Sequence, residues 1–358
     1  MKFNHRLNTH VQAFVELKKT ERLWHFPLLA GLCVGLCLWV GWFFDWPAYG
    51  NLSSIGALVI LYFTQATLSK RMVHLCVCAF GFSISFALGY AFSFSHILSA
   101  IALGLIAFLS HLITSWFDVP PPRNFFFIMI GAVATSIPIH PEAIPLNVGL
   151  VSMGAMLSVL LALFYSVFVA KRVVEPKIKS RIKKKRYTEL VASFIIGFAM
   201  FLGLMIGHWL ELKSAYWIPV SALAILQGKD LFHAWQRNLH RIIGTFIGIG
   251  ITWVMMLSTA PSGVELVFLI AGLQFIVEML VVRNYGLAVI FITPLTIFLA
   301  ENASGLHTNV NELMEARILD TVIGSLIGVL AGWFLHDEFL TAKLEKQFRS
   351  VEILLHRK

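Results

Sequence analysis

Long apolar runs recur along almost the whole chain, and they constrain the fold more than any other feature. Each run has about 18 or more apolar residues, the length that an α-helix needs to cross a bilayer. A secretory signal would give one short apolar run followed by a polar domain, which is not the pattern here. Only 13% of the residues are charged, against about 25% in soluble domains. The sequence therefore predicts an all-α, polytopic membrane protein.

The apolar windows, and the Pro, Gly or charged residues between them, predict about twelve transmembrane helices in two sets of six. The first set is expected at 24–44, 50–68, 72–94, 97–117, 123–138 and 147–170. The second set is expected at 188–209, 215–228, 238–257, 263–282, 284–300 and 313–335.

Three segments outside these helices are polar or amphipathic. Apolar and charged residues alternate in 1–23 and 336–358, which is typical of interfacial segments. Residues 171–187 form a strongly basic loop. The expected organisation is an interfacial segment at 1–23, a six-helix membrane repeat at 24–170, the basic loop at 171–187, a second six-helix repeat at 188–335 and a C-terminal amphipathic segment at 336–358.

The distribution of cations predicts the orientation. If the amino terminus lies inside, every Lys and Arg except Lys213 and Arg317 falls in a connection on that side. By the positive-inside rule both termini are expected in the cytoplasm. The same bias accounts for the net charge of +9, so we expect the basic loop to lie near anionic headgroups and we expect no nucleic-acid partner.

Motifs for cofactors and catalysis are missing from the sequence. The four cysteines, Cys33, Cys37, Cys76 and Cys78, lie inside apolar runs, so we expect neither a disulfide framework nor a metal site. No GxxxxGK[ST] phosphate loop, GxSxG elbow or HExxH helix occurs. We therefore expect a protein without cofactor, catalytic residues or ATP use, although an intramembrane hydrolase or transferase stays as a weakly supported alternative.

The two halves resemble each other in sequence. Ala48-Tyr49 recurs as Ala215-Tyr216 at an offset of 167, and Arg123-Asn124 recurs as Arg283-Asn284 at an offset of 160. Arg71 and His74 recur as Arg237 and His240 at an offset of 166. Each half has an even number of predicted helices, so the halves form two parallel repeats, an architecture common in transporters.

Short or interrupted helices add a second feature typical of transporters. A helix at 215–228 would cover only about 21 Å of a hydrocarbon core of about 30 Å. Pro294 falls in the middle of the 284–300 helix, where it frees a backbone carbonyl near Ile290, and Thr293 and Thr296 flank it. Short or interrupted helices at corresponding places in two repeats point to a transport site.

Several segments carry a family resemblance, strongest over 188–335. Tyr216-Trp217-Ile218-Pro219, the stretch from Arg237 to Gly248, Arg283-Asn284-Tyr285, and Ala316 to Gly324 with Gly328 and Gly332 resemble the fusaric acid resistance and aromatic acid exporter family. The resemblance implies an inner-membrane exporter of small aromatic carboxylates or related organic anions and drugs, driven by ion gradients. Similar modules occur in plant organic-anion channels, so a channel is the alternative transport mechanism.

A cationic face is the first candidate part of the transport path. Arg237, His240 and Arg241 are spaced i, i+3 and i+4, hence on one helical face. At a helix amino terminus they would attract a carboxylate, whereas the alternative is that they extend to lipid headgroups. Tyr216 and Trp217 are candidates for stacking on an aromatic substrate. The predicted path comprises Arg237, His240, Arg241, Thr245, Tyr216, Trp217, Arg283, Thr293, Pro294 and Thr296.

A buried charge is the second candidate. Asp320 lies one turn beyond Arg317 in an apolar, glycine-rich helix, either as a structural pair with Arg317 or as a coupling group. The glycines at four-residue spacing are expected to pack helices closely. They are Gly244, Gly248, Gly324, Gly328 and Gly332.

Taken together, these features predict a secondary transporter that exports organic anions and is not an enzyme. The expected partners are the lipid bilayer and a small organic anion, and the sequence leaves a homo-oligomer or an efflux accessory protein open. A membrane scaffold without transport is a further alternative.

Overall fold

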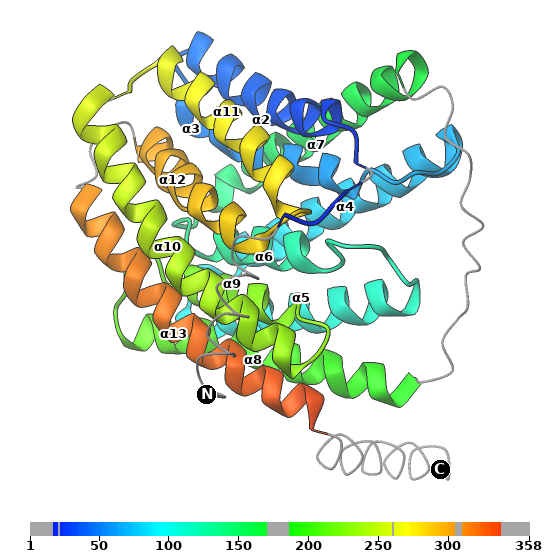
Figure 1. The fold of residues 1–358 in the computed structure, drawn as a ribbon, viewed down its shortest axis with the longest axis vertical. Coiled ribbons are helices and arrows are strands. Elements are labelled where there is room, and N and C mark those ends of the chain that lie inside the picture. Colours follow the sequence, from blue (N-terminus) through cyan, green and yellow to red (C-terminus); the bar gives the residue numbers. More distant parts are fainter. Residues whose placement is uncertain (1–16, 21, 170–185, 260, 305–309, 338–358) are drawn as a thin grey trace. The chain divides into compact units, whose positions relative to one another are not determined.

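The computed structural model describes residues 17–20, 22–169, 186–259, 261–304 and 310–337. Within these ranges the chain is helical and contains no strand (Figure 1), which confirms the all-α prediction. The basic loop at 171–187 and the amphipathic segments at 1–23 and 336–358 lie almost wholly outside the described residues.

The two halves present their helices in a similar order. The first half contains α2 (His25–Phe43), α3 (Pro47–Ala57) continued by the 3-10 helix η1 (Leu58–Tyr62), α4 (Leu68–Ala91), α5 (His96–Trp116), α6 (Phe125–Thr135), the 3-10 helix η2 (Pro141–Ala143) and α7 (Ile144–Phe168). The second contains α8 (Arg186–Trp209), α9 (Trp217–Leu226), α10 (Leu231–Thr259), α11 (Val264–Val281), α12 (Tyr285–Ser304) and α13 (Val310–His336). A short second helix follows a long first helix in both halves.

The helices have the length and composition of a multi-pass membrane protein. Eight described helices, α2, α4, α5, α7, α8, α10, α11 and α13, are long and apolar enough to cross a bilayer. Shorter apolar helices occupy Phe125–Thr135, Trp217–Leu226 and Tyr285–Ala300. Large apolar side chains such as Phe80, Phe268 and Leu326 are more than half exposed, as expected where lipid replaces water around the protein.

Two helices depart most from their predicted bounds. The second helix was expected at 50–68, but α3 starts at Pro47 and helical structure ends with η1 at Tyr62. The ninth was expected to start at 238, but α10 starts at Leu231, where the Asp230 carboxylate accepts a hydrogen bond from the His233 N–H over 2.9 Å. The first turns of α10 carry His233 and Arg237, so a hydropathy window misses them although the helix is well capped.

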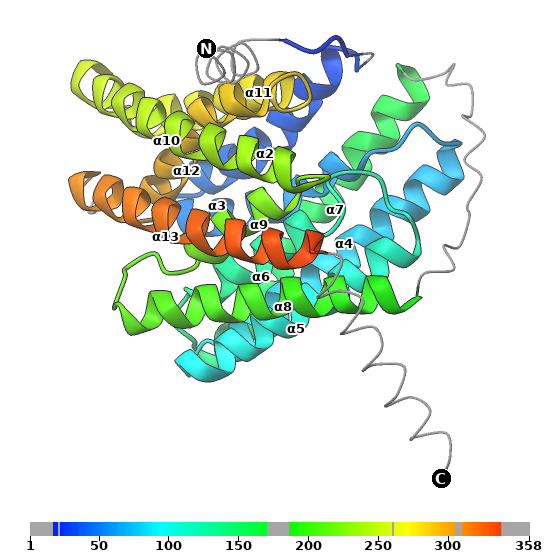
Figure 2. The ribbon, with the colours of Figure 1, turned by 60° about the horizontal axis from the view of Figure 1, so that its bottom comes forward.

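The chain forms two compact units, and each unit draws on both halves of the sequence. Unit 1 comprises Met1–Ser83, Glu142–Pro176 and Leu239–Thr321, and unit 2 comprises Ile84–Pro141, Lys177–Asn238 and Val322–Lys358. In unit 1, α2 packs on α11, and in unit 2, α8 packs on α5 (Figures 1 and 2). The first helix of each half thus packs on the fourth helix of the other half.

Close contacts in the two units repeat at the offset of the sequence repeats. A Cβ atom added to Gly31 of α2 would lie 3.4 Å from the Cβ of Phe275 in α11, and one added to Gly197 of α8 would lie 3.1 Å from the Cβ of Phe108 in α5. Gly197 follows Gly31 by 166 residues, and Phe275 follows Phe108 by 167. The interfaces α2–α11 and α8–α5 therefore use equivalent positions, as an internal duplication requires.

Candidate functional site

Short helices of opposite halves meet inside each unit. In unit 1, α3 packs on α12, and the Asn51 amide donates to the Leu299 carbonyl over 3.1 Å. In unit 2, α9 packs on α6, and the Gln227 amide donates to the Asn124 side-chain oxygen over 3.3 Å. The 10 residues of α9 and the 11 of α6 span only about 15 and 16 Å of a hydrocarbon core of about 30 Å. Neither helix can cross the hydrocarbon core alone, and short helices of this kind surround many transport sites.

One tyrosine binds the non-helical backbone that follows α6. The hydroxyl of Tyr90, a fully buried side chain of α4, donates to the Pro138 carbonyl over 3.4 Å and accepts from the His140 N–H over 3.1 Å. Irregular backbone at membrane depth is tolerated only where the protein or water satisfies its polar groups. Tyr90 supplies both a donor and an acceptor for this purpose.

The Arg71 guanidinium binds the non-helical segment that follows the short second helix of the first half. Its Nε and Nη2 donate to the Thr64 and Ala66 carbonyls, and its Nη1 donates to the Ser166 hydroxyl, each over 2.8 Å. Arg71 is buried, and its donors satisfy backbone carbonyls that no helix hydrogen bond satisfies. Three of the five guanidinium donors are thus committed to the protein itself.

Arg237 occupies the equivalent place in unit 2. Its Nε donates to the Ala224 carbonyl in the last turn of α9 over 2.8 Å. Because α10 begins at Leu231, Arg237 lies in its second turn, and the expected placement of this cationic face at a helix amino terminus is wrong. The dipole of α10 adds little there, since that effect falls off within the first turn.

The other predicted residues of α10 are buried. His240, Arg241 and Thr245 belong to the part of α10 in unit 1, and their exposed fractions are 7%, 3% and 3%. Burial within the protein does not fit side chains that extend along the surface to headgroups. Arg237 belongs to unit 2.

Pro294 interrupts the hydrogen bonding of α12 where α10 packs closely. Proline has no N–H for the Ile290 carbonyl one turn earlier. A Cβ atom on Gly248 would lie 2.6 Å from this carbonyl oxygen and 2.7 Å from the Thr293 Cβ. The Thr293 hydroxyl donates to the Val289 carbonyl over 3.1 Å. Gly248 thus lets α10 approach the irregular turn of α12.

Thr296 and Gly244, which lie beside this turn, also make close contacts within unit 1. The Thr296 hydroxyl donates to the Thr293 carbonyl over 2.9 Å. A Cβ atom on Gly244 would lie 2.9 Å from the Val289 Cβ. The predicted path residues Thr293, Pro294 and Thr296 therefore lie in a closely packed part of α12 beside α10.

Aromatic and basic residues of the predicted path lie at helix starts. Tyr216 and Trp217 begin α9 with ring centroids 5.1 Å apart, and both pack against the apolar core of unit 2. Arg283 precedes α12 in unit 1, and its carbonyl accepts a hydrogen bond from the Lys18 N–H over 3.1 Å. Tyr216 and Trp217 belong to unit 2, and Arg283 belongs to unit 1.

Asp320 is a fully buried carboxylate in α13. Neither of its side-chain oxygens accepts a hydrogen bond from a described residue. Arg317, one turn earlier, is also buried. A buried carboxylate of this kind is costly and is by default a functional candidate in a membrane helix.

The glycines of α13 face α9 and α10 in unit 2. A Cβ atom on Gly324 would lie 2.5 Å from the Ile218 carbonyl oxygen, and one on Gly328 would lie 2.9 Å from the Ala222 carbonyl oxygen. One on Gly332 would lie 3.7 Å from the Ala234 Cβ. Small residues at these positions let the helix backbones approach.

A cluster of guanidinium and aromatic groups in unit 1 was not predicted from the sequence. The Arg22 guanidinium lies over the Phe26 ring at 4.1 Å, and the Arg71 guanidinium lies over the Phe63 ring at 4.3 Å. The centroids of Phe26 and Phe63 are 5.3 Å apart, and Tyr165 meets Phe63 edge-on at 5.5 Å. Cations over aromatic faces are stabilised electrostatically, so this cluster joins positive charge to flat apolar surface.

The cluster continues into an ion pair between the half-buried Arg22 and the buried Glu278, and into a second polar contact. Arg22 Nη2 lies 3.1 Å from the Glu278 carboxylate. The Tyr165 hydroxyl hydrogen-bonds to Nδ1 of His25. We name Arg22, His25, Phe26, Phe63 and Tyr165 the cation–aromatic cluster. Its sequence signals were a cation directly before the first apolar run and one carboxylate, Glu278, inside another.

Comparison with known proteins agrees with the resemblance seen in the sequence. Residues 198–331 match the family described as fusaric acid resistance protein-like. The chain is similar to the uncharacterized membrane protein YvaC of Bacillus subtilis (strain 168), with 34% identity over 162 residues, 45% of this chain and 25% of the relative. It is also similar to the p-hydroxybenzoic acid efflux pump subunit AaeB of Pantoea ananatis (strain LMG 20103), with 29% identity over 174 residues, 45% of this chain and 27% of the relative. The chain thus spans about a quarter of the length of these relatives, and no solved structure matches it significantly.

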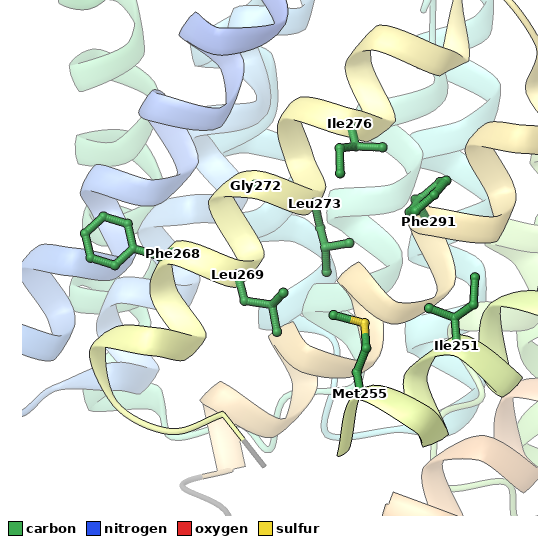
Figure 3. A pocket seen from close by; sticks show the side chains of 8 residues that line it. All are labelled: Ile251, Met255, Phe268, Leu269, Gly272, Leu273, Ile276 and Phe291. Atoms are coloured by element: carbon green, nitrogen blue, oxygen red, sulfur yellow. The ribbon is translucent and has the colours of Figure 1, made fainter. Parts of the chain in front are cut away.

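The fusaric acid resistance protein-like region also holds an apolar cavity of about 310 Å³. It lies between α10, α11 and α12 of unit 1 (Figure 3), where Ile251, Met255, Leu273 and Phe291 contribute to its lining. Its walls contain no charged or hydrogen-bonding side chain. The cavity therefore offers no partner for a carboxylate, and the cation–aromatic cluster is the better candidate for binding an anion.

Proposed function

We propose that this chain is a secondary transporter that exports small aromatic carboxylates, or related organic anions and drugs, across the bacterial inner membrane. The observation that carries the proposal is the cation–aromatic cluster, in which Arg22 lies over Phe26 beside the ring of Phe63. Arginine suits the planar carboxylate group and phenyl rings suit an aromatic ring. A membrane bundle that holds these two kinds of group side by side matches this class of solute.

Two further features support the proposal. One relative is named as a subunit of a p-hydroxybenzoic acid efflux pump. The helices α6 and α9 are too short to cross a bilayer alone, and short or interrupted helices are a feature of many transporters. With both termini placed in the cytoplasm by the positive-inside rule, Arg22 lies at the cytoplasmic end of α2, where an exported anion enters.

Transport in inverted membrane vesicles tests this function. Vesicles that contain the chain should accumulate radiolabelled p-hydroxybenzoate against its gradient when a proton gradient is imposed, and vesicles without the chain should not. An absence of movement for a panel of aromatic acids, with and without the gradient, contradicts the proposal.

The same preparation separates a carrier from an organic-anion channel. A channel would equilibrate the anion and give steady single-channel currents in planar bilayers, whereas a carrier would move it uphill without such currents. We also propose that the exporter assembles either as a homo-oligomer or with an efflux accessory protein. Mass measurement of the protein in detergent would distinguish these assemblies.

A further inference from the structure

The Arg22–Glu278 pair joins the segment before α2 to α11 inside unit 1. Arg22 Nη2 lies 3.1 Å from the Glu278 carboxylate, and Nη1 donates to the Glu278 carbonyl over 3.4 Å. The exposed side-chain fraction is 22% for Arg22 and 7% for Glu278. The cation is thus reachable from outside the protein, while its carboxylate partner lies behind it.

The helix interface does not require this ion pair. Glu278 of α11 and His111 of α5 are equivalent at the repeat offset of 167. In unit 2, Nδ1 of His111 hydrogen-bonds to the Ser193 hydroxyl of α8 over 2.9 Å. The equivalent interface therefore forms with a contact that has no carboxylate. A buried ion pair contributes little net stability relative to neutral packing, so packing alone does not account for a carboxylate at position 278.

The groups around Arg22 match an aromatic carboxylate part by part. Glu278 presents a carboxylate to the guanidinium, as a benzoate-like solute would. The Phe26 ring centroid lies 4.1 Å from the Arg22 guanidinium, and the ring centroids of Phe26 and Phe63 are 5.3 Å apart. Arg71, the other cation over this aromatic pair, is committed to two backbone carbonyls and a hydroxyl. Arg22 is thus paired with a side-chain carboxylate, the same group that the proposed solute carries.

We propose that Arg22 binds the carboxylate of the transported anion and that Glu278 is an internal counter-ion which this carboxylate displaces. The inference rests on the proposed function and names its anion-binding residue. Glu278 then acts as a competitor, because both carboxylates use the same guanidinium. Removing the charge of Glu278 strengthens anion binding, whereas removal of one partner from a purely structural ion pair weakens the site.

Binding of benzoate to the purified full chain in lipid nanodiscs tests this competition. We expect Glu278→Gln to bind benzoate at least about tenfold more tightly than wild type, and Arg22→Gln at least about tenfold more weakly, since hydrogen bonds to charged groups contribute about 1.5–3 kcal/mol. Benzamide, which has the same ring without the charge, should not distinguish wild type from Glu278→Gln.

Two charge-matched variants serve as controls. Glu265→Gln removes a carboxylate from the exposed first turn of the same helix α11, about 20 Å from position 278. Lys19→Gln removes an exposed cation near Arg22. Both should bind benzoate as wild type does, so that a change in net charge alone is excluded as the cause.

The outcomes separate this inference from the proposed function. Benzoate binding that is equal or weaker in Glu278→Gln, or unchanged in Arg22→Gln, overturns the displacement inference while transport by wild type still stands. If Arg22→Gln does not give a folded protein on size-exclusion chromatography, the sign of the Glu278→Gln effect decides alone. Absence of binding and of vesicle transport in wild type and Glu278→Gln alike overturns both.

Discussion

Replacing Gly248 by alanine tests the close packing of α10 on the proline turn of α12. The added Cβ would lie 2.6 Å from the Ile290 carbonyl oxygen, where ordinary contacts lie at 3.4–4 Å. The obstacle is backbone, which cannot rotate away, and its neighbour Pro294 already limits how α12 can adjust. We therefore expect Gly248→Ala to force α10 and α12 apart.

Gly250 of the same helix provides the matched control. It is exposed, and a Cβ atom there would meet nothing within 4 Å. Both substitutions gain the helix propensity of alanine over glycine, about 1 kcal/mol. Only Gly248→Ala adds overpacking, which typically destabilises by about 1–3 kcal/mol. The propensity gain cancels in the comparison, so Gly248→Ala should be less stable than Gly250→Ala by about 1–3 kcal/mol.

Equilibrium unfolding in detergent micelles, followed by helical circular dichroism, measures this difference. Vesicle transport should fall in Gly248→Ala and stay at the wild-type level in Gly250→Ala if the turn at Pro294 shapes the path. Equal free energies of unfolding for the two variants would refute the reasoning, because α10 and α12 would then have room for a methyl group between them.

Three other substitutions test single contacts by thermal unfolding. Arg71→Gln should destabilise the chain by about 3 kcal/mol, since it withdraws a charged donor from one buried and two partly buried acceptors. Tyr90→Phe should lower the free energy of unfolding by about 1–3 kcal/mol, because a carbonyl and an N–H lose their partner, whereas Tyr49→Phe at an exposed position should have little effect. Hydrogen bonds from the His233 backbone and side chain lower the pKa of the Asp230 carboxyl. The stabilising effect of the ionised Asp230 carboxylate is therefore complete above the ordinary pKa near 4 and is lost as the pH falls through the lowered value. Wild type should lose stability relative to Asp230→Asn in acid. Parallel pH profiles of stability for the two proteins would contradict this prediction.

Apolar periodicity predicted most of the fold because each membrane helix carries its own signal of length and hydropathy. The start of α10 was missed because Leu231 to Asn238 is amphipathic, and a hydropathy window reads it as a loop. The termination of the second helix at Tyr62 was missed because Phe63 is apolar but extended in the structure. Hydropathy does not report the backbone angles that end a helix.

The candidate site was less predictable because it depends on contacts between distant segments. Arg22 and Glu278 are 256 residues apart, and they meet only because α2 of the first half packs on α11 of the second. A single sequence gives the charge of each residue but not this pairing. The spacing of Arg237, His240 and Arg241 was visible, yet spacing alone does not show whether a guanidinium faces a solute or a backbone carbonyl.

The kind of acceptor distinguishes structural from solute-binding arginines in this chain. Arg71 donates to the Thr64 and Ala66 carbonyls in the non-helical segment after η1, and Arg237 donates to the Ala224 carbonyl in the last turn of α9. These acceptors are backbone groups, which are held in place by the chain. Arg22 also donates through Nη1 to the Glu278 carbonyl, but its Nη2 faces the Glu278 side-chain carboxylate, which can move aside when another carboxylate takes its place. A carrier needs a partner for its solute that is occupied in the empty state and released in the loaded one, because an unpaired cation inside the membrane is costly. Arg22 is the arginine of the cation–aromatic cluster that meets this requirement, and so the anion-binding residue is expected in the segment before α2 rather than on the cationic face of α10.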